Sequence, residues 1–403
     1  MKKVLTAFLI TVIIFACTGS RNDKDTRSAV EVMMFASPAA DSCAEPYLFA
    51  DKNGLVYLSW IEKKGKESSL NFSVLSGDKW SEPVTIASGN NWFVNWADYP
   101  VIASDGNNNL IAHYLEKSDT AKFTYDIKII SSIDSGKTWS ASKILHDDNV
   151  KAEHGFVSTT PFESGFLAAW LDGRKSATGA VAGAHAGHHG EMTLRGAVLD
   201  NTGTKTSEWE LDSRICDCCQ TGVAITNNGP VVVYRDRSDD EVRDISVVRY
   251  VNGQWTSPKT IYPDNWQIKA CPVNGPRISA IGNDLAIAWF SMKNKLGEVK
   301  LIFSKDGGET FNKPFRIDEG NSIGRVGVIM LDSATAMASW MEGTDIRVVK
   351  VHGDGSKGIP ITIAASTEKR SGGFPQMTKS GNKVFFAWTD DKAKTIRTAS
   401  ISL

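Results

Sequence analysis

Two eight-residue segments with one shared pattern constrain the fold of this chain more than any other sequence feature. Residues 132–139 read SIDSGKTW and residues 304–311 read SKDGGETF, so both fit Ser-x-Asp-x-Gly-x-Thr-aromatic. In such a turn the aspartate can accept backbone N–H bonds, the glycine tolerates a positive φ, and the aromatic ring fills an apolar gap. The recurrence predicts a chain built from repeats rather than around one continuous core.

The turn residues of these two segments carry a family resemblance. They are Asp134, Gly136 and Trp139 in the first segment, and Asp306, Gly308 and Phe311 in the second. In these residues the chain resembles the Asp-box (BNR-repeat) proteins, whose best-known members are the sialidases. The resemblance implies a β-propeller in which the box lies at the blade periphery, away from the active site. The boxes are therefore more specific for the repeat than for an enzyme.

A second repeat runs along the whole chain: a short apolar strand that follows a small turn and ends in an aromatic residue. The terminal aromatics are Trp60, Tyr114, Trp170, Tyr234, Trp289, Trp340 and Trp388, at intervals of 48 to 64 residues. A period of about 50 residues is typical of four-stranded propeller blades. We predict an all-β propeller of seven blades, in which a strand at residues 30–35 completes the last blade. Six blades, as in the sialidases, with an irregular extra hairpin are the alternative.

The N-terminus predicts export and anchoring. Residues 1–16 contain Lys2 and Lys3 and then an apolar run too short to span a membrane, which is typical of a signal peptide. The sequence Ile-Phe-Ala-Cys at residues 14–17 resembles a bacterial lipobox, which implies cleavage before Cys17 and lipidation of its thiol. An ordinary signal peptide with a chance cysteine is the alternative. Residues 17–29 are polar and predict a tether, which leaves residues 30–403 for the propeller.

The charge pattern argues against a nucleic-acid function. Loss of residues 1–16 removes two lysines, so 43 Lys and Arg face 46 Asp and Glu, without a basic tail or stripe. We expect a monomer of the bacterial cell envelope that contacts the membrane through its N-terminal lipid and faces the periplasm or the outside. A glycan or small molecule, rather than nucleic acid, is the expected ligand.

The least usual feature is a group of cysteines. Cys216, Cys218 and Cys219 lie within four residues, and Cys271 follows Cys216 after 55 residues, about one blade period. Both segments precede an expected innermost strand, so we expect these cysteines at similar heights on adjacent blades near the axis. An oxidising compartment favours two disulfides, in which neighbouring Cys218 and Cys219 take different partners, with Cys43 free or pairing instead.

A metal site and redox-active free thiols are the alternatives to disulfides. Thiolates select soft ions such as Cu(I) or Zn(II), and three close cysteines with a distant fourth could complete a tetrahedral site. Copper or zinc is the one cofactor that the sequence suggests. The histidines at 185, 188 and 189 belong to a Gly/Ala-rich segment, residues 176–189, which predicts a mobile loop or a weak metal-binding tract. His154 precedes an inner strand and is expected to be a structural histidine.

We expect the strands that end in the aromatic markers to be the innermost ones and to end at the central axis. Charged residues near their ends are candidates for a site at the central funnel. Converging arginines suit a carboxylate ligand, and aspartates among them can act as general acid or base. The candidates are Asp98, Asp172, Arg174, Arg235, Asp236 and Arg237. The alternative is a set of ion pairs that lock adjacent blades together, with Asp172–Arg174 and Asp236–Arg237 as examples.

The resemblance to sialidases implies three arginines that hold a carboxylate, a tyrosine nucleophile with a glutamate, and an aspartate acid/base. The first of these arginines has no counterpart, because the only arginines before residue 170 are Arg21 and Arg27, both in the tether. The sequence FRID at 315–318 looks similar but follows the second box, and no tyrosine–glutamate pair can be assigned by motif. Three functions therefore stay open: a sialidase-like glycoside hydrolase, a propeller that binds a soft metal or does redox work through its cysteines, and a glycan- or protein-binding scaffold.

Overall fold

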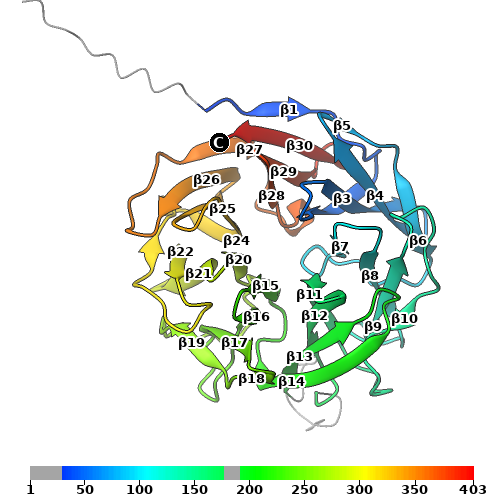
Figure 1. The fold of residues 1–403 in the computed structure, drawn as a ribbon, viewed down its shortest axis with the longest axis horizontal. Coiled ribbons are helices and arrows are strands. Elements are labelled where there is room, and N and C mark those ends of the chain that lie inside the picture. Colours follow the sequence, from blue (N-terminus) through cyan, green and yellow to red (C-terminus); the bar gives the residue numbers. More distant parts are fainter. Residues whose placement is uncertain (1–29, 177–190) are drawn as a thin grey trace, which may run out of the picture. The chain divides into compact units, whose positions relative to one another are not determined.

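The computed structural model describes residues 30–176 and 191–403, and the propeller is the compact unit Glu31–Leu403. Seven antiparallel sheets are arranged around a central axis (Figure 1). The predicted all-β propeller with seven blades is therefore confirmed. The predicted signal peptide, the tether with Cys17, and the three histidines at 185, 188 and 189 lie outside the described residues.

The first four blades follow one another along the chain from the N-terminal side. Blade 1 contains β2 (Cys43–Ala50), β3 (Val56–Lys64), β4 (Glu67–Ser76), β5 (Lys79–Trp80) and β6 (Val84–Gly89). Blade 2 contains β7 (Ile102–Ser104), β8 (Leu110–Lys117), β9 (Tyr125–Ser132) and β10 (Lys143–Ile144). Blade 3 contains β11 (His154–Phe162), β12 (Gly165–Asp172), β13 (Met192–Leu199) and β14 (Lys205–Ile215). Blade 4 contains β15 (Gly222–Thr226), β16 (Gly229–Arg235), β17 (Ile245–Val251), β18 (Gln254–Trp255) and β19 (Lys259–Tyr262).

The last three blades complete the ring. Blade 5 contains β20 (Arg277–Ile281), β21 (Asp284–Lys293), β22 (Leu296–Ser304) and β23 (Phe315–Arg316). Blade 6 contains β24 (Ser322–Met330), β25 (Thr335–Glu342), β26 (Asp345–His352) and β27 (Ile361–Ala365). Blade 7 contains β28 (Gln376–Ser380), β29 (Lys383–Asp390), β30 (Thr395–Ser402) and β1 (Met33–Phe35). A 3-10 helix, η1 (Arg370–Gly372), precedes β28, and no helix within the described ranges has the length and apolar character for crossing a membrane.

The ring closes as predicted, through the first described strand. β1 pairs antiparallel with β30, with Met33 opposite Ser400 and Phe35 opposite Thr398. The last blade therefore contains strands from both ends of the propeller, and its third strand has a hydrogen-bonding partner on its outer side (Figure 1). Such closure protects a sheet edge that would otherwise be open.

The aromatic markers lie on the second strand of each blade. The innermost strands are β2, β7, β11, β15, β20, β24 and β28, whereas Trp170 belongs to β12 and Tyr234 to β16. The expectation that the marker strands end at the axis is therefore wrong. The first and second strands of a blade are both strongly apolar, so hydrophobicity alone does not distinguish one from the other. The charged residues that follow Trp170 and Tyr234 consequently start one strand away from the axis.

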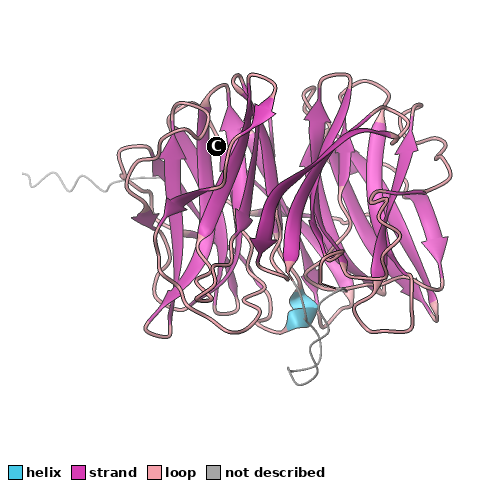
Figure 2. Ribbon diagram, turned by 90° about the horizontal axis from the view of Figure 1, so that it is seen from below, coloured by secondary structure: helices cyan, strands magenta, loops and turns pink. Residues whose placement is uncertain are grey.

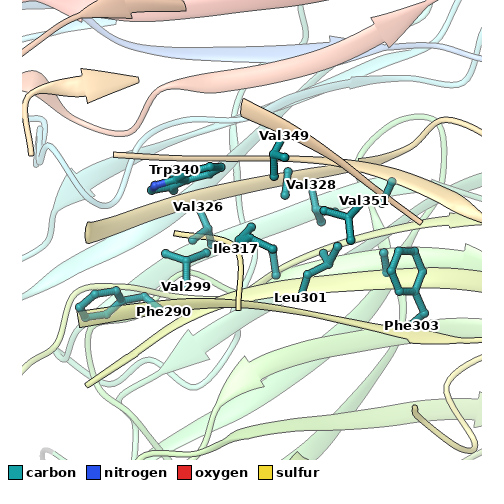
Figure 3. Packing of buried hydrophobic residues seen from close by; sticks show 14 of the residues in the cluster. Phe290, Val299, Leu301, Phe303, Ile317, Val326, Val328, Trp340, Val349 and Val351 are labelled. Carbon is teal, nitrogen blue, oxygen red and sulfur yellow. The ribbon is translucent and has the colours of Figure 1, made fainter. Parts of the chain in front are cut away.

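Large aromatic side chains fill the space between and within blades. Trp60, Trp170, Trp289 and Trp340 are each at most 2% exposed. In Figure 3, Trp340 and Val349 of blade 6 lie close to Val326 and Val328 of the same blade, with Leu301 and Phe303 of blade 5 on the other side of the cluster. Burying such side chains is worth roughly 1.5–3 kcal/mol each, which explains why the marker positions recur in every blade.

The two Asp boxes form the turns that the pattern predicts. Asp134 accepts hydrogen bonds from the Thr138 backbone N–H (2.9 Å), the Thr138 hydroxyl (2.7 Å) and the Ser132 hydroxyl (2.7 Å). These bonds, led by the one from the Thr138 hydroxyl, lower the pKa of Asp134 to about 2. Gly136 and Gly308 have φ of +82° and +83°. Trp139 packs edge-on against Phe72 of blade 1, with ring centroids 5.7 Å apart.

Strand connectivity separates the boxes from the candidate site. In an antiparallel blade, the turns after the first and third strands lie on one face, whereas the turns after the second strand and between blades lie on the other. Both boxes follow a third strand, β9 or β22. The cysteines and the candidate charged residues lie in connections of the opposite kind, or at the last residue of a strand that leads into one, on the face that also carries η1 (Figure 2).

Candidate functional site

The four clustered cysteines come from two successive inter-blade connections. Cys216, Cys218 and Cys219 connect β14 to β15, and Cys271 lies in the connection from β19 to β20. The two connections are tied together by the Gln220 side chain, which accepts a 2.9 Å hydrogen bond from the Gly275 backbone N–H. The four cysteines therefore lie beside adjacent blades, as predicted.

Three of the four sulfur atoms converge. The Sγ atoms of Cys216, Cys218 and Cys219 all lie within 4.8 Å of one another, and the Cys216 thiol donates to Cys219 Sγ at 3.3 Å. The Cys271 thiol interacts with that of Cys218 but does not lie within 4.8 Å of all three. Each of the five described cysteines carries a free thiol, so the predicted bridges are not formed in this structure. Cys43 is buried elsewhere, at the start of β2, with its Sγ 3.7 Å from the Asp41 carbonyl oxygen.

Two buried arginines lie next to this sulfur cluster. Burial raises the pKa of the Cys219 thiol, but hydrogen bonds with Cys216 and Cys218 and the positive charge of Arg235 together hold it well below its usual range. Burial raises the pKa of Cys216 to about 11, although the charge of Arg243 opposes this. Arg243 is 3% exposed, and its Nε and Nη1 atoms have no hydrogen-bond partner among the described residues. Negative charge on the sulfurs would therefore be stabilised here.

A cavity of about 640 Å³ gives access to the cluster. Cys271 lines it and is exposed, whereas Cys216 and Cys219 are 0% and 2% exposed. The other lining side chains are mostly charged, with carboxylates such as Glu241 alongside Arg237 and Lys269. A small polar species can reach Cys271 from solvent, and the remaining sulfurs lie behind it.

The predicted Asp172–Arg174 pair is an ion pair in the structure. Arg174 donates through Nε and Nη2 to the two carboxylate oxygens of Asp172, at 2.7 and 2.8 Å. The same guanidinium also contacts Asp148 at 3.0 Å and Glu208 at 3.2 Å. This geometry agrees with the interpretation of these two residues as a structural lock.

The predicted Asp236–Arg237 ion pair is wrong. Arg237 instead pairs with Glu241 (2.7 Å) and Asp217 (3.2 Å). Asp236 accepts from the Arg237 backbone N–H at 2.6 Å and from the Ser246 hydroxyl at 3.0 Å. The side chain of Arg237 turns away because Glu241, four residues later in the same connection, gives it a bidentate partner.

Arg235 has a structural position behind the cysteines. It is 2% exposed and donates to the carbonyl oxygens of Asn274, Arg243 and Phe290, at 2.6–3.1 Å. Its guanidinium also lies 4.9 Å from the centroid of the Trp266 ring. All three guanidinium nitrogens of Arg235 thus donate to carbonyl oxygens of the protein, so it is not free to bind a substrate carboxylate.

Asp98 lies at the axis, as the sequence suggested, and lines a cavity of about 160 Å³. It is 3% exposed and accepts from the Phe156 backbone N–H at 2.7 Å and from the Tyr125 hydroxyl at 3.2 Å. Burial raises the pKa of Asp98 to about 7. A carboxyl group with this pKa can hold or release a proton near neutral pH.

No sequence pattern pointed to the second carboxyl that Tyr125 brings close to Asp98. The Tyr125 hydroxyl also lies 2.8 Å from Glu153 Oε1, and burial raises the pKa of Glu153 to about 8. One hydroxyl proton can serve only one of two carboxylates, and burial favours the protonated form of both Asp98 and Glu153. Only adjacency in the sheet could have shown this pair: residue 125 begins β9, and residue 153 forms a bridge with it.

Arg277 shares the axial cavity with Asp98 and differs from the other arginines near the axis. It lies near the Tyr99 ring, donates to the Tyr99 hydroxyl and the Thr221 carbonyl oxygen, and has no carboxylate partner among the described residues. Burial lowers the pKa of Arg277 to about 10. Arg325, by contrast, donates to three carbonyl oxygens of residues 367–369. Arg277 is therefore the arginine that an anionic ligand in this cavity would meet.

A buried histidine pair lies between blades 2 and 3. The rings of His146 and His154 are parallel within 1° and 3.6 Å apart, and Asp148 contacts both, at 3.2 and 2.9 Å. A metal ion lies in the ring plane of each histidine that binds it, so two parallel stacked rings cannot share one ion in this arrangement. The expectation of a structural role for His154 agrees with this geometry.

Three solved structures align with this chain at low sequence identity. The polysaccharide lyase Uly1 aligns with a TM-score of 0.55 and 9% identity, over 89% of this chain and 90% of that chain. The GH93 α-L-arabinofuranosidase of Fusarium graminearum gives a TM-score of 0.49 and 12% identity, over 92% and 96%. The NanB sialidase from Streptococcus pneumoniae, as its K499G mutant, gives 0.46 and 13%, over 92% and 70%.

Family comparison identifies the repeat. No curated protein matches this chain. The model of the BNR repeat-like domain matches residues 64–391, which include both Asp boxes and most of the seven blades. The resemblance read from the two boxes is therefore confirmed, and the chain belongs to the BNR repeat-like domain family.

Proposed function

We propose that this protein binds a soft metal ion, Cu(I) or Zn(II), through Cys216, Cys218, Cys219 and Cys271. The observation that carries the proposal is the convergence of the Cys216, Cys218 and Cys219 thiols. Cys271, from the next inter-blade connection, interacts with Cys218 and can supply a fourth ligand. Soft thiolate ligands select these ions over the hard cations that prefer oxygen. The function would be metal binding, and the propeller would hold the two cysteine-containing connections in fixed positions.

The spacing of the sulfurs supports the proposal. A tetrahedral site with Zn–S bonds of about 2.3 Å places its sulfurs about 3.8 Å apart. Cys216 Sγ and Cys219 Sγ are 3.3 Å apart, so a few tenths of an ångström of movement would make this pair fit. Cys218 Sγ lies within 4.8 Å of both of these sulfurs, so the three could bind one ion after a small movement.

Charge balance around the cluster gives further support. One Zn(II) with four thiolates, or one Cu(I) with three, carries a net charge of −2. Arg235 lies beside Cys219 and Arg243 beside Cys216, so two positive charges face such a cluster. The unpartnered Nε and Nη1 atoms of Arg243 would gain sulfur acceptors. Buried donors without partners cost free energy, which the charged cluster would recover.

Metal analysis of the reduced propeller tests this function. We expect about one equivalent of zinc or Cu(I) per chain, and thiolate charge-transfer absorption when cobalt replaces zinc. Cys218→Ser should lower the affinity by more than about 100-fold, because it removes the central ligand. Cys43→Ser is the matched control, because Cys43 is also a buried free thiol but lies outside the cluster. Less than a tenth of an equivalent in the wild type, or unchanged affinity in Cys218→Ser, would contradict the proposal.

A carbohydrate-active function is the second candidate, supported by Arg277 and Asp98 in the axial cavity. Asp98 would act as general acid or base, and Arg277 would pair with an acidic group of the ligand. The family of the chain and the fold it shares with a polysaccharide lyase are consistent with a glycan ligand. The cavity of about 160 Å³ is smaller than usual ligand pockets of roughly 300–1,000 Å³, which ranks this function second. Lack of turnover on a panel of fluorogenic glycosides, sialosides included, would remove it.

The place of action is part of the proposal. The protein would be a monomeric lipoprotein of the cell envelope, anchored through Cys17. Labelling with a palmitate analogue should mark the wild type and not Cys17→Ser, and the variant should leave the membrane fraction. A labelled Cys17→Ser protein would refute this anchor.

A further inference from the structure

We infer that the four-cysteine cluster is a redox switch, in which oxidation to the disulfides Cys216–Cys219 and Cys218–Cys271 ejects the metal. The inference rests on the proposed metal-binding function and adds the regulation of that site. Its basis is the close grouping of Cys216, Cys218 and Cys219, with the 3.3 Å contact between Cys216 and Cys219, and the exposure of Cys271 beside them.

The contacts select one pairing of the three that four thiols allow. A bridge between neighbouring Cys218 and Cys219 would strain the peptide that joins them. Pairing Cys216 with Cys218 would leave Cys219 to bridge Cys271. The Cys216 and Cys219 sulfurs are in direct contact at 3.3 Å, so they are the pair closest to bond formation. Their bridge leaves Cys218 to join Cys271, with which it already interacts.

Exposure sets the order of the reactions. Cys271 lines the cavity of about 640 Å³ and is exposed, Cys218 is half-buried, and Cys216 and Cys219 are at most 2% exposed. An external disulfide therefore meets Cys271 first. The Cys216–Cys219 pair can be oxidised only through Cys218, which contacts both buried sulfurs.

The chemistry is thiol–disulfide exchange with a disulfide of a small thiol or of a thiol oxidoreductase as oxidant. The Cys271 sulfur attacks this disulfide and releases one external thiolate, and Cys218 then displaces the second to form Cys218–Cys271. Cys216 attacks Cys218 of this bridge, and Cys219 attacks Cys216, which leaves Cys216–Cys219 and frees Cys218 and Cys271. A second external disulfide reoxidises these two.

The net reaction accounts for the metal. Four protein thiolates and two external disulfides give two protein disulfides and four external thiolates, with four electrons passing from protein to oxidant. A disulfide sulfur is no longer a thiolate ligand, so the ion leaves as the bridges form. In the oxidised protein Arg235 and Arg243 no longer face negative sulfurs, which favours return to the reduced, metal-bound state when reductant is present.

Glutathione disulfide is the probe for the test. Metal-free and zinc-loaded protein, residues 30–403, are incubated with it and then digested without reduction. Trypsin cuts after Arg214 and Lys269, so Cys216, Cys218 and Cys219 share one peptide and Cys271 lies on another. We expect the two peptides to be joined and to have lost two hydrogens per bridge. Partial reduction with differential alkylation should assign Cys216–Cys219 and Cys218–Cys271, with one zinc ion released per two bridges.

Two variants separate this mechanism from non-specific oxidation. Cys271→Ser removes the exposed thiol and should slow oxidation of the remaining three cysteines by at least about tenfold. Cys216→Ser should still form Cys218–Cys271, with Cys219 left reduced. Cys43→Ser, which changes a buried thiol outside the cluster, should oxidise and release zinc like the wild type.

The outcomes distinguish the switch from the metal site itself. A Cys216–Cys271 bridge, no bridge in the metal-free protein, or zinc retained after both bridges form would each overturn the switch while leaving metal binding intact. Failure of the reduced protein to take up zinc would overturn the proposed function. Formation of the two named bridges in that protein would still establish the pairing.

Discussion

The guanidinium of Arg243 lies beside the thiol of Cys216, and its Nε and Nη1 atoms have no nitrogen or oxygen acceptor among the described residues. Its Nη2 atom donates to Glu241 at 2.7 Å, so a carboxylate balances one edge of the group. Negative charge on the sulfurs would stabilise the other edge. Arg243 should therefore stabilise the negatively charged form of the cysteines.

Replacement of Arg243 should weaken metal binding more than it weakens folding. Arg243→Gln removes the positive charge next to a cluster of net charge −2, which we expect to cost roughly 1–3 kcal/mol of binding free energy, or about 5- to 150-fold in affinity. Competition with a chelator of known affinity measures the change. The control is Arg397→Gln, on the outer part of blade 7 and half exposed, which should bind metal like the wild type. Equal losses in both variants would contradict this role.

The carboxyls of Asp98 and Glu153 should make stability fall as pH rises. Burial raises their pKa values to about 7 and 8, so between pH 4 and pH 8 the folded state holds protons that the unfolded state has released. Their contribution is complete below pH 4 and is lost as the pH passes these folded-state values. Unfolding in urea at pH 5 and pH 8 should show this loss in the wild type.

The variant Glu153→Gln isolates the effect. The amide keeps a hydrogen bond with Tyr125 but does not titrate, so the decrease in unfolding free energy between pH 5 and pH 8 should shrink by about 1–3 kcal/mol. Glu82→Gln, at an exposed position of blade 1, should keep the wild-type pH dependence. The same slope in all three proteins would show that Glu153 is ionised in the folded state at pH 5.

The two Asp boxes offer a matched pair of glycine substitutions. Gly136 and Gly308 have nearly the same positive φ, but a Cβ on Gly136 would collide with the Phe72 ring, whereas on Gly308 it would meet its neighbours at 3.4–3.6 Å. Gly308→Ala should cost about 1 kcal/mol for the backbone conformation, and Gly136→Ala about 1–3 kcal/mol more for the overlap. Urea unfolding of both variants gives the difference, and equal costs would be inconsistent with the packing between blades 1 and 2.

Loss of the charge of Arg235 should destabilise the protein much more than loss of the charge of Arg277. Arg235→Met leaves several buried carbonyl oxygens without a donor and should cost about 3–5 kcal/mol of stability. Arg277→Met removes a buried cation that has no carboxylate partner among the described residues, so its stability should stay within about 1 kcal/mol of the wild type. Melting curves compare the two, and a large loss in Arg277→Met would argue for a structural arginine rather than a ligand-binding one.

The repeat signals were sufficient to predict the ring because each acts within a short stretch of chain. An Asp box places its carboxylate, glycine and threonine within eight residues, and the resulting turn is visible in the sequence and unchanged in the structure. The aromatic markers recur because every blade has to fill the same space beside its neighbour. Seven markers therefore predicted seven blades and their closure by residues 30–35, although not that the marker strand is the second of each blade.

The candidate site depended on contacts that no local pattern encodes. The sequence predicted only that Cys218 and Cys271 lie at similar heights on adjacent blades. The tertiary structure decided which of the sulfurs interact. The pairing of Tyr125 with Glu153, and of Arg237 with Glu241 rather than Asp236, depends on strand register and side-chain direction. The sequence by itself thus determined the repeat, its number and its turns, because these follow from short-range chemistry. Only the tertiary structure decided which charges are paired and which remain available, because buried partners are chosen by packing across blades.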